Sequence, residues 1–286
     1  MMLNKKGNIQ TFLGCTACYE NSDIVIFGAP FDSTTTNRPG ARFAPAAMRM
    51  ESYGLETYSP YLERDLEDIS VYDAGDLELP VGNAQSTLNM IQNVTKDILD
   101  NSKFPLMIGG EHLVTLGAIR EFSRQYPDLR IIHFDAHADL RDDFLGEKLS
   151  HSTVIRRCWE LLGDNKIFQF GIRSGEKSEF EWAKEHVFMN KFNFDGLEKV
   201  IESLRNYPVY FTLDLDVLDS GVFWGTGTPE AGGVSFMQLL SAIKQLSVLN
   251  LVGADIVELA PNLDTSGVST ATACKVLREL ILSISI

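Results

Sequence analysis

Short runs of apolar residues alternate with longer amphipathic segments along most of the chain. The short runs predict strands at residues 24–27, 69–72, 106–108, 131–134, 167–170, 209–213 and 251–257. The amphipathic segments predict helices at residues 84–99, 113–125, 153–162, 178–185, 196–204, 235–246 and 269–283. Ser235 and Ser269 stand at positions where a helix N-cap is expected.

This alternation predicts an α/β fold with three layers, in which helices cover both faces of a mostly parallel central sheet. The 286 residues, of which 44% are hydrophobic, suffice for a large core. No linker, low-complexity segment or internal repeat interrupts the sequence, so we expect one domain over residues 1–286. In such folds functional side chains gather at the carboxyl ends of the strands.

The charge balance narrows the range of partners. Lys and Arg number 25 against 39 Asp and Glu, which gives a formal net charge of −14. Nucleic-acid-binding proteins normally show the opposite balance or a basic block, so nucleic acid is not an expected partner. An acidic surface can attract a cationic small molecule, although many proteins are acidic for solubility alone.

The cysteines and the apolar runs indicate a cytoplasmic protein. Cys15 and Cys18 have CxxC spacing, but no second Cys or His pair completes a zinc site, and we interpret the spacing as chance. With four cysteines in total, the chain has no dense disulfide framework, which suits a reducing compartment. No apolar run reaches the length of a membrane span, so a membrane is not an expected partner.

Two runs of potential metal ligands follow predicted strands that are far apart in the sequence. Asp135, His137 and Asp139 occupy alternate positions in the run DAHAD, and Asp214 and Asp216 do so in DLD. Since side chains at alternate positions of a strand point to one face, each run directs its ligands to one side. Four carboxylates at the ends of buried strands would repel one another and lose hydration. A pair of divalent cations between them would compensate for both effects.

A third run, GGEH at residues 109–112, places His112 after the predicted strand at 106–108. A lone histidine near an apolar run is usually a core residue, and only the neighbouring motifs make His112 a candidate ligand. The candidate ligands are therefore His112, Asp135, His137, Asp139, Asp214 and Asp216. This set suits two ions about 3.5 Å apart. Its many oxygens favour Mn²⁺, with Fe²⁺, Co²⁺ or Zn²⁺ as competitors. Such a site activates water near neutral pH, which predicts a hydrolysis.

At this point the sequence resembles the ureohydrolase family, which includes arginases, agmatinases and their relatives. The resemblance extends from Gly28 to about Leu280 and includes SHST at 150–153, GTGTPE at 225–230 and DIVE at 255–258. The opening segments, GAPFD at 28–32 and TNRPGARFAP at 36–45, are similar to the agmatinase branch. The family implies an arginase-like αβα fold and self-association as trimers or hexamers.

The resemblance also implies how the candidate ligands divide between two Mn²⁺ ions per subunit. One ion would be bound by His112, Asp135, Asp139 and Asp214, and the other by His137, Asp135, Asp214 and Asp216, so that Asp135 and Asp214 bridge. A hydroxide bridging the ions would attack the guanidinium carbon of the substrate. The expected reaction is the hydrolysis of agmatine to putrescine and urea, a step in polyamine synthesis.

Three residues would assist this reaction in the family pattern. Asp139 would orient the hydroxide and help transfer a proton to the leaving amine. His151 would relay protons, for which a pKa near neutrality is suitable. Glu258 would hold the guanidinium as a bidentate acceptor. Without the resemblance, His151 could equally be a capping residue and Glu258 a buried salt-bridge partner.

The segment between Asp139 and His151 is where the family distinguishes substrate tails. Its acids Asp142, Asp143 and Glu147 suit the ammonium tail of agmatine, although acids in loops are often merely solvated. The nearest alternative is a sister ureohydrolase acting on arginine, guanidinobutyrate, aminopropylagmatine or formiminoglutamate. Two further classes are a non-catalytic regulator, which would be expected to lack some ligands, and a metal-dependent deacetylase, which needs fewer of them.

Overall fold

Eight parallel strands form the central sheet of the part of the chain that the computed structural model describes, residues 10–284. The strand order is β4-β1-β5-β10-β9-β6-β7-β8. The strands are β1 Ile24–Gly28, β4 Val71–Asp76, β5 Phe104–Ile108, β6 Arg130–Phe134, β7 Ile167–Ile172, β8 Phe188–Lys191, β9 Pro208–Asp214 and β10 Asn250–Val257. A small antiparallel pair, β2 Tyr58–Ser59 and β3 Arg64–Asp65, lies outside this sheet.

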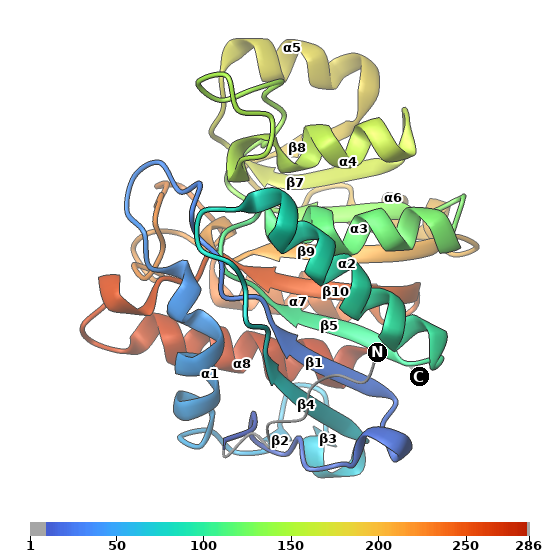
Figure 1. Cartoon of the computed structure of the whole chain (residues 1–286), viewed down its shortest axis with the longest axis vertical. Helices are drawn as coiled ribbons and strands as arrows, with labels where there is room; N and C mark the ends of the chain where they lie inside the picture. The colour runs from blue at the N-terminus through green and yellow to red at the C-terminus, as the bar shows by residue number, and fades with distance from the viewer. Residues whose placement is uncertain (1–9, 285–286) are drawn as a thin grey trace.

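Helices cover both faces of the sheet, as Figure 1 shows. One face packs against α2 Ala84–Asp100, α3 Val114–Gln125, α4 Val154–Leu162 and α5 Lys177–His186. The other face packs against α1 Ala44–Ser52, α6 Leu197–Leu204, α7 Phe236–Leu246 and α8 Val268–Ser283. Each face carries its own apolar core, because alternate side chains of the buried strands point to opposite sides. The predicted three-layer α/β fold is confirmed.

Every predicted strand and helix is present, with bounds that differ by a few residues. Sequence reasoning missed β8, α1 and the β2–β3 pair. Strand β8 lies at the edge of the sheet, its residues are partly or fully exposed, and only two of its four residues are apolar, so its sequence signal is weak. Helix α1 has Pro45 in its first turn, where the missing N–H costs nothing, although a proline usually interrupts helical periodicity.

One of the two predicted N-caps is confirmed and the other is wrong. Ser235 accepts a hydrogen bond from the backbone N–H of Gln238 and forms a capping box with it. Helix α8 instead begins at Val268, behind Gly267 at a φ of 77°. Ser269 donates its hydroxyl proton to Asp264 and accepts from the backbone N–H of Gly225, so it ties a loop to the helix.

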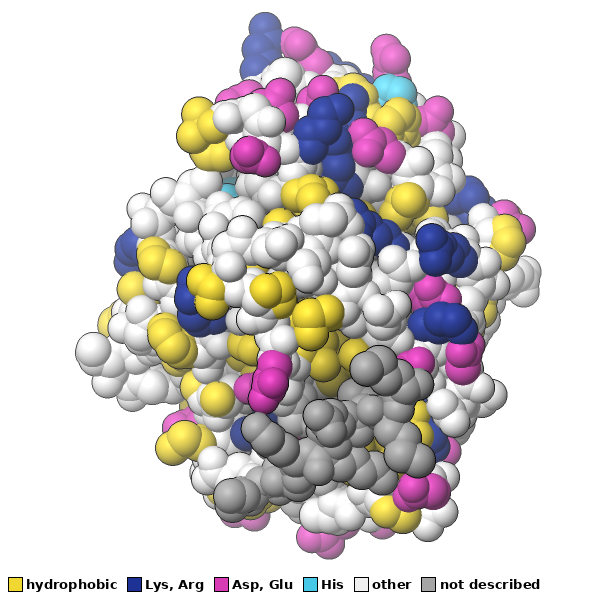
Figure 2. Space-filling model, in the orientation of Figure 1, with side chains coloured by type: hydrophobic (Ala, Val, Ile, Leu, Met, Phe, Trp, Pro, Cys, Tyr) yellow, Lys and Arg dark blue, Asp and Glu magenta, His cyan; other side chains and the backbone are white. Residues whose placement is uncertain are grey.

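The surface drawn in Figure 2 carries charges of both signs. Lys and Arg side chains lie among Asp and Glu side chains, most densely at the end of the molecule where α4 and α5 lie. Among residues 10–284, none of the helices combines the length and the apolar character that crossing a membrane requires. Cys15 is buried and Cys18 is exposed, and both thiols are free.

Candidate metal centre

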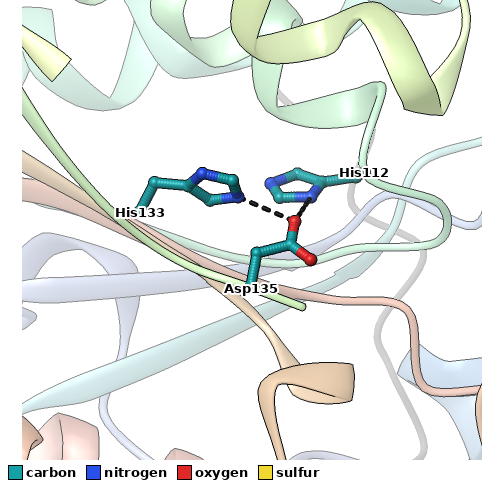
Figure 3. A group of neighbouring side chains, drawn as sticks. All are labelled: His112, His133 and Asp135. Atoms are coloured by element: carbon teal, nitrogen blue, oxygen red, sulfur yellow. Dashed lines mark hydrogen bonds and ion pairs between the residues drawn. The ribbon is translucent and has the colours of Figure 1, made fainter. Parts of the chain in front are cut away.

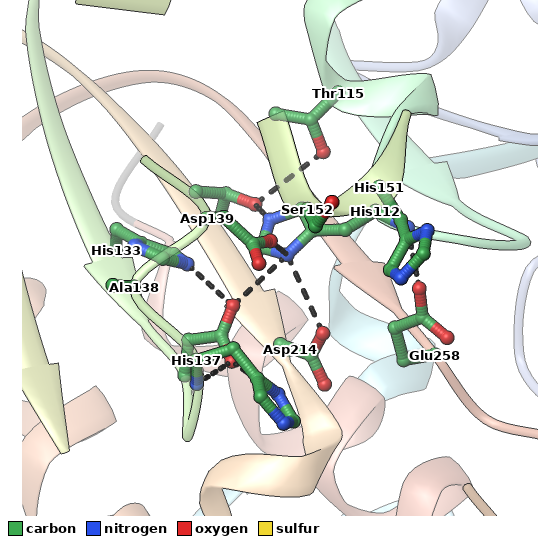
Figure 4. Close-up of polar contacts among 12 residues, drawn as sticks. His112, Thr115, His133, His137, Ala138, Asp139, His151, Ser152, Asp214 and Glu258 are labelled. Carbon is green, nitrogen blue, oxygen red and sulfur yellow. Dashed lines mark hydrogen bonds and ion pairs between the residues drawn. The ribbon is translucent and has the colours of Figure 1, made fainter. Parts of the chain in front are cut away.

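The predicted ligands come together where four adjacent strands of the sheet end. Strands β5, β10, β9 and β6 are neighbours, and each carries a predicted site residue at or just after its carboxyl end. His112 follows β5, Asp135 follows β6, Asp214 closes β9 and Glu258 follows β10. Parallel strands therefore bring residues more than 100 positions apart to one edge, as Figure 4 shows.

One half of the cluster surrounds the Nδ1 atom of His112. This nitrogen lies 3.1 Å from an Asp135 oxygen and 3.3 Å from oxygens of both Asp139 and Asp214. It is nevertheless buried without a hydrogen-bond partner. Adjacent ligands of an octahedral ion with bonds of about 2.1 Å lie about 3 Å apart. The spacing is that of ligands around a common cation.

The other half of the cluster surrounds His137. Its Nδ1 atom lies 2.9 Å from Asp216 Oδ2, which is also buried without a hydrogen-bond partner, and 3.6 Å from Asp135 Oδ1. Asp135 thus directs one oxygen to His112 and the other to His137. Asp135 would therefore offer one oxygen to each of two ions. Two groups of residues lie close enough to hold an ion: His112, His133 and Asp135, and separately Asp135, His137 and Asp216.

The electrostatics of the cluster also call for cations. Burial and repulsion by Asp216 and Asp135 raise the pKa of Asp214 well above its usual value. Burial and the Asp135 charge raise the pKa of Asp139 to about 7. Although burial opposes it, His133 and His112 hold the pKa of Asp135 well below its usual range. No Lys or Arg of residues 10–284 forms an ion pair with these carboxylates. Bound divalent ions would favour the ionised forms, so the donor set fits a pair of them.

His133 belongs to this cluster, although sequence reasoning missed it (Figure 3). Its Nε2 atom lies 2.7 Å from Asp135 Oδ2. Gln169 donates its amide hydrogens to the backbone oxygen of Ala138 and to His133 Nδ1, so His133 Nε2 carries the proton donated to Asp135. His133 therefore orients a carboxylate rather than offering a free ligand atom. Its position two residues before Asp135 on the same face of β6 was the available signal.

Two acids of the site adopt a backbone conformation that side chains disfavour. Asp139 has a φ of 54° and Glu258 a φ of 66°. Glu258 accepts a hydrogen bond of 2.7 Å from the backbone N–H of His112. Burial and repulsion by the Glu111 carboxylate raise the pKa of Glu258 well above its usual value. Strained and electrostatically unfavourable residues of this kind concentrate at functional sites.

His151 lies at the rim of the cluster, on the short helical turn before α4. Its Nδ1 atom is 3.3 Å from the Ser150 hydroxyl, and its backbone N–H donates to the Thr34 hydroxyl. Burial and the nearby His137 and His112 lower the pKa of His151 to about 4. The expectation of a pKa near neutrality was therefore wrong, because a pKa of about 4 leaves the His151 imidazole neutral at physiological pH.

A pocket opens beside the cluster. Its lining includes Thr36, His137, Asp139, Arg141, Phe144, His151, Glu176, Glu179, Asp214 and Glu258. The acids Asp142, Asp143 and Glu147 of the predicted tail-binding segment are not among the lining residues.

Each of these three acids has another partner or is exposed to solvent. Asp142 pairs with Arg157 at 2.9 Å, Asp143 accepts from the backbone of Gly146, and Glu147 is exposed. Their role in holding a substrate tail stays a prediction. Besides the predicted site acids, the pocket is lined by two further acids, Glu176 and Glu179.

The chain matches known proteins along almost its whole length. A profile of the Arginase family matches residues 22–283. The agmatinase of Bacillus anthracis is 50% identical over 278 residues, which cover 96% of each chain. A crystal structure from Clostridium difficile is 53% identical, covers 94% of this chain and 99% of its own, and superposes with a TM-score of 0.92. The agmatine ureohydrolase of Thermoplasma volcanium is 32% identical, with a TM-score of 0.88 and coverage of 96% and 94%. The chain therefore belongs to the arginase family, the ureohydrolases that its motifs indicate.

Proposed function

We propose that this protein is an agmatinase, which hydrolyses agmatine to putrescine and urea with two Mn²⁺ ions per subunit. The observation that carries the proposal is the convergence of His112, His137 and four aspartates beside a pocket that Glu258 also lines. Arginase-family enzymes depend on two metal ions, and the identity of 50% to an agmatinase supports the choice of substrate.

The side chains of the pocket suit the individual steps of this reaction. Two divalent ions supply Lewis acidity and make water nucleophilic near neutral pH. The Glu258 carboxylate would hold the guanidinium, whose positive charge offsets the unfavourable burial of this acid. Asp139 would orient the attacking water and accept its proton. His151, which is neutral in this structure, would take up a proton and deliver it to the leaving amine.

Glu176 is the pocket acid that we assign to the ammonium tail of agmatine. It lines the pocket and lies 3.0 Å from Arg141, which holds its carboxylate in place. Replacing Glu176 by Gln should raise KM for agmatine about tenfold with a smaller change in kcat, because only the tail loses a partner. Asp142→Asn removes an equally negative side chain outside the pocket and serves as the matched control. Equal effects of the two substitutions on KM would contradict the assignment of Glu176 and favour the predicted tail-binding acids of the segment between Asp139 and His151.

A sister activity is the second candidate. Arg141 lines the same pocket and could pair with the carboxylate of arginine or guanidinobutyrate. Both Glu176 and Glu179 already neutralise Arg141, which favours a cationic tail over an anionic one. Aminopropylagmatine shares that cationic tail, whereas formiminoglutamate does not.

Urea release from purified, Mn²⁺-loaded protein tests the proposal. Agmatine, arginine, guanidinobutyrate and aminopropylagmatine would be compared at equal concentration, with ammonia or formamide release measured for formiminoglutamate and a chelator as control. Chelator-sensitive urea from agmatine at the highest kcat/KM is the expected result. A higher kcat/KM with another compound would assign the protein to that sister activity. No release from any of them would refute a catalytic role.

The remaining parts of the proposal follow from the family resemblance and the sequence. We propose that residues 1–286 form one domain, that the protein works in the cytoplasm, and that it assembles as a trimer or hexamer. Elemental analysis of the purified protein would identify the bound metal. Sedimentation equilibrium would give the number of subunits, and a monomer would contradict the assembly.

A further inference from the structure

A second buried carboxylate lies behind His112, on the side of the imidazole away from the aspartate cluster. Asp255 is on β10 and is fully buried. It belongs to the run DIVE, of which only Glu258 has a role in the proposed reaction. No Lys or Arg of the described residues forms an ion pair with Asp255. A buried carboxylate without a cationic partner is unfavourable unless hydrogen bonds compensate for its lost hydration.

Asp255 reaches His112 through one hydroxyl group. Thr212 lies directly opposite Asp255 in the β9–β10 register and donates its hydroxyl proton to Asp255 Oδ1 at 2.6 Å. The same hydroxyl oxygen lies 3.0 Å from His112 Nε2. Tyr210, two residues earlier on the same face of β9, donates to Asp255 Oδ2 at 2.7 Å. All four side chains are buried, so water does not compete for these bonds.

The direction of these bonds determines which nitrogen of His112 is free. A threonine hydroxyl has one proton, and a carboxylate can only accept. Because Thr212 gives its proton to Asp255, its oxygen can only accept from His112, so Nε2 carries the imidazole hydrogen. A cation among the three carboxylate oxygens would therefore meet the lone pair of Nδ1, which is the atom that faces these oxygens. Ligand histidines commonly depend on such a partner behind the ring.

We infer that Asp255 and Thr212 are positioning residues that hold His112 in the tautomer and orientation needed to bind a metal ion. The inference rests on the proposed metal-dependent function, since it concerns one of its two ions. Asp255 fixes the direction of the Thr212 hydroxyl, and Thr212 fixes the ring. Among the described residues, His137 has no contact with this chain of hydrogen bonds, so the ion beside it would depend on Asp255 only indirectly, through the carboxylates shared by the two ions.

Mn²⁺ binding to metal-free protein tests this inference without relying on turnover. Free Mn²⁺ would be followed by electron paramagnetic resonance during a titration of the wild type and of single variants. Thr212→Val should weaken one of two binding steps by about 10- to 100-fold and the other by much less. Thr212→Ser, which keeps the hydroxyl, should restore that step to within about threefold. At Mn²⁺ concentrations that saturate both sites, Thr212→Val should recover urea release, because the substitution acts through metal affinity.

Tyr210→Phe is the matched control, since it perturbs the same buried network but leaves the Asp255–Thr212–His112 bonds in place. It should keep both affinities, even if it lowers the melting temperature. Asp255→Asn changes no volume and keeps the test decisive if Thr212→Val fails to fold; it should weaken the same single step by about tenfold.

Three results would overturn the inference. Wild-type affinities in both Thr212→Val and Asp255→Asn would show that His112 needs no partner behind it. An equal loss in Tyr210→Phe would show that the network contributes only packing. Equal weakening of both steps would contradict a specific effect on the His112 side. A wild-type protein that binds fewer than two ions would instead refute the proposed function itself, so the two failures are distinguishable.

Discussion

Replacing Asp139 by Asn should make the metal-free protein more stable, although it removes a predicted metal ligand. Asp139 is buried beside Asp135, and both effects raise its pKa to about 7 from an ordinary value of 3.8. The folded chain therefore binds an extra proton between these two pH values and loses stability as the pH rises through that window. Asparagine has nearly the same shape without the charge. It also tolerates the φ of 54° at this position.

The size of the effect follows from the two pKa values. One pKa unit corresponds to about 1.4 kcal/mol, so an ionised Asp139 destabilises the metal-free fold by about 4 kcal/mol near pH 7.5. Because the neighbouring Asp135 and Asp214 adjust their own ionisation, we expect a gain of about 2–4 kcal/mol for the variant. Near pH 4 the carboxyl is protonated in most folded molecules and in many unfolded ones, and the gain should fall below about 1 kcal/mol.

Urea unfolding in the presence of a chelator, at several pH values between about 4 and 8, measures this difference directly. Asp143→Asn, which changes an exposed acid four residues away, should shift the free energy of unfolding by less than about 0.5 kcal/mol. Added Mn²⁺ should reverse the order, so that the wild type gains stability and Asp139→Asn gains less. A variant that is less stable than the wild type in chelator, or equally stabilised at every pH, would refute the electrostatic reasoning.

Three further substitutions test the roles proposed for other site residues. Asp214→Ala removes a ligand that faces His112 and should abolish at least 99% of urea release, measured at saturating Mn²⁺ with a thermal melt as control for folding; full turnover would contradict a role in metal binding. Glu258→Gln should lower kcat/KM for agmatine by about 10²-fold or more, while Mn²⁺ affinity stays near that of the wild type, because this acid is assigned to the guanidinium. His151→Asn should lower kcat by about 10²-fold in initial-rate measurements, and partial rescue by added imidazole would separate lost proton transfer from lost structure; an unchanged kcat would show that another group carries the proton.

The fold could be predicted from the sequence wherever burial on both faces of a strand leaves a strong apolar signal. The central strands β5, β6, β9 and β10 are buried almost throughout and were predicted close to their observed bounds. The edge strand β8 was missed because its stability comes from pairing with β7 rather than from its own apolar residues. The start of α8 was misplaced because Ser269 has the chemistry of an N-cap but binds a distant loop instead.

The metal-binding part of the site could be predicted because runs of ligand residue types follow several apolar runs of the sequence. Ligand residue types at alternate positions after apolar runs predicted that Asp135, His137 and Asp214 lie in one cluster. The prediction is correct because the sheet fixes where the ends of its strands lie. The side chains of the segment acids could not be placed in this way. Asp142 turns to Arg157 on α4, a tertiary contact that no local pattern indicates. Glu176 lines the pocket because β7 lies next to β6 in the sheet, so the loop after β7 reaches the same edge as the loop after β6.

Three features that destabilise the fold in the absence of bound ligands, namely burial of an acid, a raised pKa and a left-handed backbone, occur together at the same two residues. Asp139 and Glu258 are both buried, both have raised pKa values, and both hold a left-handed backbone that costs about 1–3 kcal/mol. They cannot relax away from these costs, because each follows a strand packed in the middle of the sheet. The ligand oxygens at this site already lie close together before a cation binds, so little binding free energy is needed to order them. Asp139 and Glu258 lower the free energy of unfolding of the metal-free protein. Binding of the ions and of the guanidinium relieves this destabilisation, which therefore adds to their binding free energy. It follows that the stability gained by Asp139→Asn in chelator and the Mn²⁺ affinity that this variant loses should be two measurements of one effect.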